Sequence, residues 1–205
     1  TSRGVAAHAS RPDLGRNAIT PLARIAVALA ERGLPGEHPE LGKVTANVGT
    51  IEGGAGTNVV PSHAMLSIDI RTVPGVDPDR LIETVRSLAG PAEDITIETV
   101  VSFAPVYSTP DGPFISLVAE TCRAVQGRVM PSAPLTYFTD ASVLAPRLGC
   151  PEVTILGPGD PDLAHAVDES CSAQDILQAA AIYQGVLEKD LDARYTATRG
   201  QGTCL

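Results

Sequence analysis

Two different hydrophobic periods alternate along the first hundred residues. Between Asn17 and Arg32 apolar residues recur every three or four positions, which predicts an amphipathic helix that ends before Gly33. The predicted apolar face consists of Ile19, Leu22, Ile25 and Leu29. Over 77–88 the same period returns, with Asp77 as the expected N-cap, Pro78 at the first helical position and a stripe of Leu81, Val85 and Leu88.

Strand-like segments separate and flank these helices. Strands are expected over 3–10, 43–51, 62–71 and 94–103. The third is the clearest, because Ala64, Leu66, Ile68 and Ile70 alternate with more polar residues that point to the other face. The resulting order β-α-β-β-α-β predicts a ferredoxin-like sandwich of the α+β class over residues 1–108.

The second half, residues 109–205, has an α/β pattern with few strands. Helices are expected over 113–126 and 140–148, and strands around 129–137 and over 151–156. A terminal helix should begin after the capping pair Ser172 and Asp175. Its predicted buried face consists of Ile176, Ala180, Tyr183 and Leu187.

Composition narrows the class of function. The 205 residues carry a net charge of -9, 3% aromatics and no cluster of Lys and Arg, which argues against a nucleic-acid partner. No apolar run reaches the roughly 20 residues that a membrane span requires, so no membrane partner is expected. The four cysteines form no CxxC pair, so neither a zinc knuckle nor a disulfide framework is indicated, and reduced thiols in the cytoplasm are the expectation.

Individual polar residues each allow a functional and a structural interpretation. His165 lies in a loop after a predicted strand, where it is either a zinc ligand or a solvated loop residue. His8 lies beside Ser10 at the end of the first strand. Arg71 is either a bidentate carboxylate binder or the partner of Asp69 in a salt bridge. Asn58 lies in a glycine-rich turn, where Asn often occurs only because it adopts the turn conformation easily.

The segment Gly157–Pro158–Gly159 precedes His165. An anion-binding turn is one interpretation, but the proline between the glycines removes an N–H donor, which favours a tight turn over a phosphate loop. Asp168 and Glu169, which follow the histidine, are either groups that support a metal site or polar residues ahead of the last helix.

Four segments in order resemble one known family. GVAAHASRPDLGRNAI, GTNVVPSHAMLSIDIRTVPG, YFTDASVLAPRLGCP and ILGPGDPDLAHAVDE are similar to motifs of the di-zinc aminoacylase and metallopeptidase family. The resemblance is strongest to its acetylornithine deacetylase and succinyl-diaminopimelate desuccinylase subgroup, and it covers residues 3 to about 190. It implies that 1–108 is a lid and dimerisation domain and that 109–205 is the C-terminal portion of the catalytic domain.

The resemblance also implies a role for each matching residue. His8 would reach the active site of a partner subunit and donate to the developing oxyanion, while Asn58 and Arg71 hold the substrate. Thr139, Gly157 and Gly159 would lie near the pocket, and His165 would bind zinc. The implied reaction is hydrolysis of an N-acyl amino acid by a homodimer with two Zn²⁺ ions, Co²⁺ being the alternative metal.

Residues 1–205 lack much of what complete members of this family carry. The other zinc ligands and the glutamate base have no counterpart in the chain, so it is expected to be inactive without a further N-terminal half. Two alternatives remain. One is a non-enzymatic dimerisation module derived from the family, and the other is an amino-acid-binding regulatory domain, which leaves residues 130–190 unexplained.

Overall fold

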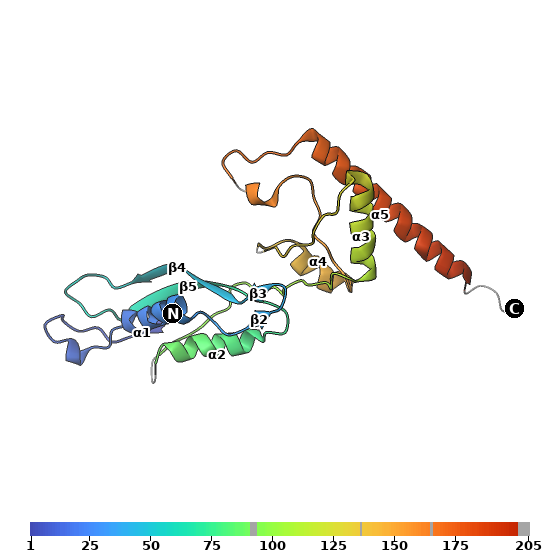
Figure 1. Ribbon diagram of the computed structural model, residues 1–205. Helices are drawn as coiled ribbons and strands as arrows, with labels where there is room; N and C mark the ends of the chain where they lie inside the picture. The colour runs from blue at the N-terminus through green and yellow to red at the C-terminus, as the bar shows by residue number, and fades with distance from the viewer. Residues whose placement is uncertain (91–93, 136, 165, 201–205) are drawn as a thin grey trace. The chain divides into compact units, whose positions relative to one another are not determined.

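The computed structural model describes residues 1–90, 94–135, 137–164 and 166–200 and the side chains of these residues as far as Leu191. The chain consists of two compact units, residues 1–105 (unit 1) and residues 106–205 (unit 2) (Figure 1). Among the described residues, no helix is both long enough and apolar enough to cross a membrane.

Unit 1 is built on an antiparallel sheet with the strand order β1-β5-β4. The strands are β1 (Ser2–Arg3), β4 (Thr45–Gly53) and β5 (His63–Arg71). An antiparallel bridge from Ser2 to Ile95 adds a fourth segment beyond β1. In chain order of the four segments the sheet reads fourth, first, third, second, which is the arrangement of a ferredoxin-like sandwich, so this prediction is confirmed.

Two helices, α1 (Ile19–Arg32) and α2 (Pro78–Leu88), contact each other and cover one face of this sheet (Figure 1). Their ends follow the sequence signals. Gly33 ends α1 at a positive φ of 65°, which glycine adopts without strain. Asp77 caps α2 by accepting a hydrogen bond from the Asp79 amide, 3.0 Å away.

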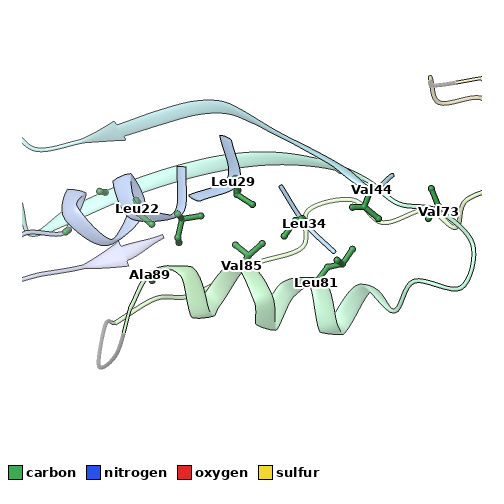
Figure 2. Packing of buried hydrophobic residues seen from close by; sticks show 11 residues of the cluster. Leu22, Leu29, Leu34, Val44, Val73, Leu81, Val85 and Ala89 are labelled. Carbon is green, nitrogen blue, oxygen red and sulfur yellow. The ribbon is translucent and has the colours of Figure 1, made fainter. Parts of the chain in front are cut away.

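The core of unit 1 lies between the helices and the sheet. Figure 2 shows side chains of α1 and α2 pointing toward each other and toward the strands. The buried cluster consists of Ala18, Leu22, Ile25, Leu29, Leu34, Val44, Ala64, Val73, Leu81, Val85 and Ala89. Ala64 is fully buried, and Leu66, Ile68 and Ile70 pack against the cluster, so the predicted inward face of this strand is confirmed.

Two strands of unit 1 are shorter than predicted. The strand expected over 3–10 ends at Arg3, because the chain then leaves β5: Val5 pairs with Arg16, and His8 pairs with Val59. The strand expected over 94–103 is reduced to the bridge at Ile95, since β1 offers it so few partners. Between α1 and β4 the chain forms a small hairpin of β2 (Glu37–His38) and β3 (Gly42–Lys43).

Unit 2 consists mainly of helices. These are α3 (Pro113–Gln126), α4 (Ala141–Leu148) and α5 (Ala173–Gly200). Each unit also has a short 3-10 helix, Pro12–Leu14 in unit 1 and Pro161–Leu163 in unit 2. Helices α3 and α5 pack together (Figure 1), and their contact buries Val118, Cys122 and Ile182. All three predicted helices are therefore present, and Ser172 accepts from the Asp175 amide at 3.0 Å as the capping pair implies.

The two strands predicted in unit 2 are wrong. Neither the described residues of 129–137 nor residues 151–156 form a strand. Side chains hold the second segment instead, because Ser108 Oγ bonds both backbone groups of Val153, at 2.7 Å and 2.8 Å. The Tyr183 hydroxyl donates to the Leu156 carbonyl at 2.7 Å. Residues 151–156 therefore have the apolar composition of a strand, but no other strand among the described residues pairs with them.

Helix α5 also buries a different face from the one predicted. Ala179 and Ile182 are buried, Ile182 against α3, whereas the predicted face is open to solvent. The open stripe consists of Ile176, Ala180, Tyr183, Leu187 and Leu191, and Leu187 is 62% exposed. Periodicity identified an apolar face correctly, but it could not say which neighbour that face meets.

Candidate functional site

His8 and Asn58 come together through the pairing of two loops in unit 1. The Ala9 amide donates to the Asn58 carbonyl at 2.9 Å, and the Val60 amide donates to the Ala7 carbonyl at 2.8 Å. These bonds flank the isolated bridge between His8 and Val59. Two polar residues that lie 50 positions apart in sequence are thereby held at the same end of the sheet, and both side chains are exposed.

The imidazole of His8 is oriented by a tight turn. Its Nδ1 lies 2.8 Å from Ser10 Oγ, and the Ser10 amide donates to the same nitrogen at 3.2 Å. The turn is closed by a bond from the Arg11 amide to the His8 carbonyl at 2.9 Å. The ring is therefore held through Nδ1, which leaves Nε2 as its outward-facing atom.

Arg71, at the last position of β5, already holds a carboxylate. Its Nε donates to Asp69 Oδ1 at 2.7 Å and its Nη2 donates to Asp69 Oδ2 at 3.0 Å, a two-pronged contact. Both side chains are about half exposed, at 52% each. The pair is therefore hydrogen-bonded at both carboxylate oxygens and remains open to solvent.

The His8–Asn58 pair and Arg71 lie at opposite ends of the sheet. Asn58 and the loop that carries His8 adjoin the beginning of β5, whose first residues His63 and Ala64 face Arg3 and Ser2. Arg71 ends the same strand. Eight residue steps of extended chain separate His63 from Arg71, or about 27 Å at the usual rise of a strand. One small ligand cannot touch both groups of the same chain.

The remaining predicted site residues belong to unit 2. Thr139 precedes α4, and its carbonyl accepts from the Ser142 amide at 3.1 Å. Gly157 and Gly159 lie in an exposed turn, where Gly159 has a φ of 88° and its α-carbon faces the Cys171 side chain. The positive φ explains why glycine suits this position. His165 lies outside the described residues.

The described residues do not assemble a metal site by themselves. No group of three or more His, Cys, Asp or Glu side chains gathers within the described part of the chain. Asp168 and Glu169 follow His165 in an exposed turn in which the Glu169 amide donates to Ala166. These donors do not provide the ligand set for two metal ions.

One thiol has a shifted acidity. Burial against α5 raises the pKa of Cys122 above its ordinary value, because the thiolate would lose its hydration. Cys150 and Cys171 are exposed. Cys122 therefore serves as a packing residue of α3.

Several contacts that shape these sites have no clear sequence signal. Ser108 lies 45 residues from Val153, whose backbone it holds, and Glu152 accepts from the Phe114 amide at 2.7 Å at the start of α3. Such contacts depend on tertiary structure. The contact between Ser10 and His8 is local, because the two residues are only two positions apart. A contact of this kind can be anticipated from the sequence.

Comparisons with known proteins concern the fold and the family of the chain. Residues 1–94 match the profile of the M20 peptidase dimerisation domain. Acetylornithine deacetylase of Myxococcus xanthus is 29% identical over 194 residues, which are 88% of this chain and 48% of that protein. A probable carboxypeptidase of Paracoccidioides brasiliensis is 31% identical over 198 residues, 91% of this chain and 42% of that protein.

Solved structures support the fold. Aminopeptidase PepT of Bacillus cereus superposes with a TM-score of 0.71 at 24% identity, covering 91% of this chain and 49% of that one. An M20 family metallo-carboxypeptidase of Sulfolobus solfataricus gives a TM-score of 0.64 at 19% identity, covering 91% and 59%. The chain spans about half the length of the curated relatives it matches. The chain is thus similar to deacetylases and metallopeptidases of the M20 family over about half of their length, and its residues 1–94 match the peptidase dimerisation domain of that family.

Proposed function

We propose that this chain is the lid and the C-terminal catalytic portion of a metal-dependent amidohydrolase that deacylates N-acyl amino acids in the cytoplasm. Similarity to an acetylornithine deacetylase over 88% of the chain supports this activity. The observation that carries it is the pairing of His8 with Asn58 in a dimerisation domain, far from Arg71. Residues that one chain keeps apart can meet in one site of a dimer.

The proposed homodimer forms through unit 1. Strand β4 pairs with β5 on one side, and among the described residues no strand pairs with its other side. Its nine residues, Thr45–Gly53, therefore present an open row of backbone donors and acceptors. An open edge of this length is suited to pairing with the same strand of a second copy.

In the proposed dimer each active site combines residues from both subunits. His8 and Asn58 of one subunit reach the site of the other, where His8 donates to the oxygen that becomes negative during amide hydrolysis. Arg71 acts in the site of its own subunit and binds the carboxylate of the amino acid, in exchange for Asp69. The His8–Asn58 pair and Arg71 lie at opposite ends of β5, and in this dimer they act in different active sites.

Unit 2 supplies the proposed pocket loops of the catalytic domain. Thr139, Gly157 and Gly159 would line the pocket, and His165 would bind one of two Zn²⁺ ions, or Co²⁺ in their place. The metal would polarise the substrate carbonyl and activate water. The other ligands and the base would come from the portion of the relatives' length that this chain does not span.

Two features of unit 2 support the proposal that further chain completes the catalytic domain. The open stripe of α5 includes four large side chains, of which Leu187 and Leu191 are 62% and 64% exposed. Residues 151–156 have the composition of a buried strand but no strand neighbour among the described residues. Both features are explained if additional chain pairs with the segment and covers the helix.

A complementation experiment tests the shared site. Full-length His8→Ala and Arg71→Ala proteins should each lose activity, with His8→Ala lowering kcat about 10²-fold or more. Unfolding and refolding the two together should restore about a quarter of the wild-type rate, because half of the dimers are mixed and each has one intact site. Failure of the mixture to recover, with mixed dimers present, would show that both residues act in one chain.

A second experiment tests the division of labour between the two halves. Purified 1–205 with Zn²⁺ should not hydrolyse N-acetyl- or N-succinyl-amino acids, because it lacks the base and most ligands. Adding the complementary N-terminal half should restore hydrolysis. Turnover by 1–205 alone would contradict the proposal, and dimerisation without any rescue would favour a non-enzymatic dimerisation module.

A further inference from the structure

The turn from His8 to Arg11 specifies which ring nitrogen carries the proton. A backbone amide can only donate, so the Ser10 N–H at 3.2 Å requires a lone pair on His8 Nδ1. The Ser10 hydroxyl, 2.8 Å from the same atom, can also donate to it. In the neutral imidazole the proton is therefore on Nε2.

The opposite nitrogen is available to a ligand. The His8 side chain is exposed, and among the described residues no hydrogen bond to its Nε2 is found. With its proton on Nε2, the neutral ring can donate outward from that atom but cannot accept a proton or bind a metal there. The geometry thus separates a donor role from the roles of general base and metal ligand.

The same arrangement recurs at a second histidine. His38 Nδ1 accepts from the amides of Glu40 and Leu41, each at 3.3 Å, so its neutral ring should also carry the proton on Nε2. His38 lies in the β2–β3 hairpin and has no part in the proposed site. It provides an internal control for the assignment at His8.

We propose that Ser10 is a positioning residue that holds His8 as the Nε2–H tautomer, so that His8 acts as a hydrogen-bond donor to a carbonyl or carboxylate oxygen. The inference rests on the proposed function for the identity of the oxygen, but not for the tautomer. Ser10 itself contacts only the far side of the ring. Its amide selects the tautomer, and its hydroxyl restrains the orientation of the ring.

Nuclear magnetic resonance of the 205-residue chain tests the tautomer without any activity. With ¹⁵N-labelled histidine at a pH where the rings are neutral, long-range ¹⁵N–¹H correlations should show an unprotonated Nδ1 and a protonated Nε2 for both His8 and His38. Addition of Zn²⁺ should leave the His8 signals in place. A protonated Nδ1 at His8, or a shift of its Nε2 with Zn²⁺, would overturn the inference.

Activity of the full-length protein tests the role of Ser10. Ser10→Ala should lower kcat about two- to tenfold, the range for one lost hydrogen bond, with KM little changed. Ser10→Thr, which keeps the hydroxyl, should recover most of that loss. Ser67→Ala, on the open face of β5, is the matched control and should behave as wild type. A Ser10→Ala protein with unchanged kcat would remove Ser10 from the mechanism.

Amide substitutions locate the donating atom. The amide nitrogen of glutamine reaches about as far as Nε2 of histidine, whereas that of asparagine matches Nδ1. His8→Gln should therefore retain more kcat than His8→Asn, and the opposite order would contradict donation from Nε2. If His8→Ala leaves kcat unchanged while the tautomer is as expected, the proposed function fails and the tautomer assignment stands.

Discussion

Units 1 and 2 are similar in length but differ in how much apolar surface they bury. Unit 1 has a cluster of eleven buried residues from two helices, a sheet and the loops between them. Among the described residues of unit 2 the cluster between α3 and α5 has three, and Val129, Leu148 and Leu177 are each more than 70% exposed. Unit 1 therefore buries a larger apolar core, whereas unit 2 leaves more of its large apolar side chains open to solvent.

This difference separates what each unit needs in order to function. In unit 1 the His8–Asn58 pair and the open edge of β4 belong to a unit with a well-buried core. Unit 2 carries the loops at Thr139 and Gly157, and several of its large apolar side chains are exposed. This contrast supports the proposed division into a dimerisation domain and a catalytic portion that further chain completes, and the predictions below test it.

The largest expected effect comes from the core of unit 1. Ile25 is 2% exposed, and Ile25→Ala should lower the free energy of unfolding of unit 1 by about 2–5 kcal/mol. The chain has no Trp and all four Tyr lie beyond residue 105, so tyrosine fluorescence reports on unit 2 alone. In urea, circular dichroism should therefore show an earlier transition while tyrosine fluorescence keeps its midpoint.

The exposed Val27, two positions away on α1, is the control for this substitution. Val27→Ala should change stability by no more than about 0.5 kcal/mol. Ile182→Ala in unit 2 should have the reverse signature, moving the fluorescence transition alone. If Ile25→Ala moved both transitions equally, the two units would unfold as one body and the contrast between them would fail.

Sequence reasoning succeeded where elements carry their own signals. The helices of unit 1 were predicted from a strict period of three to four together with Asp77 and Gly33 at their ends, and β5 from strict alternation. It failed where a neighbour decides the outcome. Residues 151–156 have a strand pattern, but a strand requires another strand to pair with, and periodicity in one segment does not say whether one is present.

The candidate site was predictable to a similar degree. The resemblance drew attention to His8, Asn58 and Arg71, and the structure places the first two together by pairing their loops. The bond between Arg71 and Asp69 was one of two alternatives, because residues two apart on a strand share a face. The bonds from Ser108 to Val153 could not be predicted, since 45 residues and a tertiary fold intervene.

A smaller effect is expected on the open stripe of α5. Leu187→Lys should change the stability of 1–205 by about 0.5 kcal/mol or less, because the side chain is already in water. It should nevertheless reduce the fluorescence of a bound hydrophobic dye such as ANS. In the full-length protein the same change should be destabilising by about 2 kcal/mol, since a charge would then be buried.

The neighbouring Glu188→Lys serves as the control for charge, because Glu188 lies outside the stripe and is exposed. It should alter neither dye binding by 1–205 nor the stability of the full-length protein. If Leu187→Lys were equally harmless in the full-length protein, the stripe would not be covered there.

The smallest effect concerns the thiol of Cys122. Because burial raises its pKa, the folded state holds this proton to higher pH than the unfolded state does, so the contribution to stability is complete at neutral pH and is lost as pH rises above the ordinary thiol range. Alkylation by iodoacetamide should modify Cys150 and Cys171 first, and Cys122 only in denaturant. Rapid alkylation of Cys122 in the native chain would show that the α3–α5 contact opens readily.

Hydrogen exchange of residues 1–205, read by mass spectrometry, tests the central contrast most directly. Peptides from α1, α2 and β5 should remain protected for hours, because their amides open only with the core of unit 1. Peptides from 129–135 and 151–160 should exchange within seconds and become protected when the complementary N-terminal half is added. Equal protection of both units in the chain alone, with no change on that addition, would contradict the account.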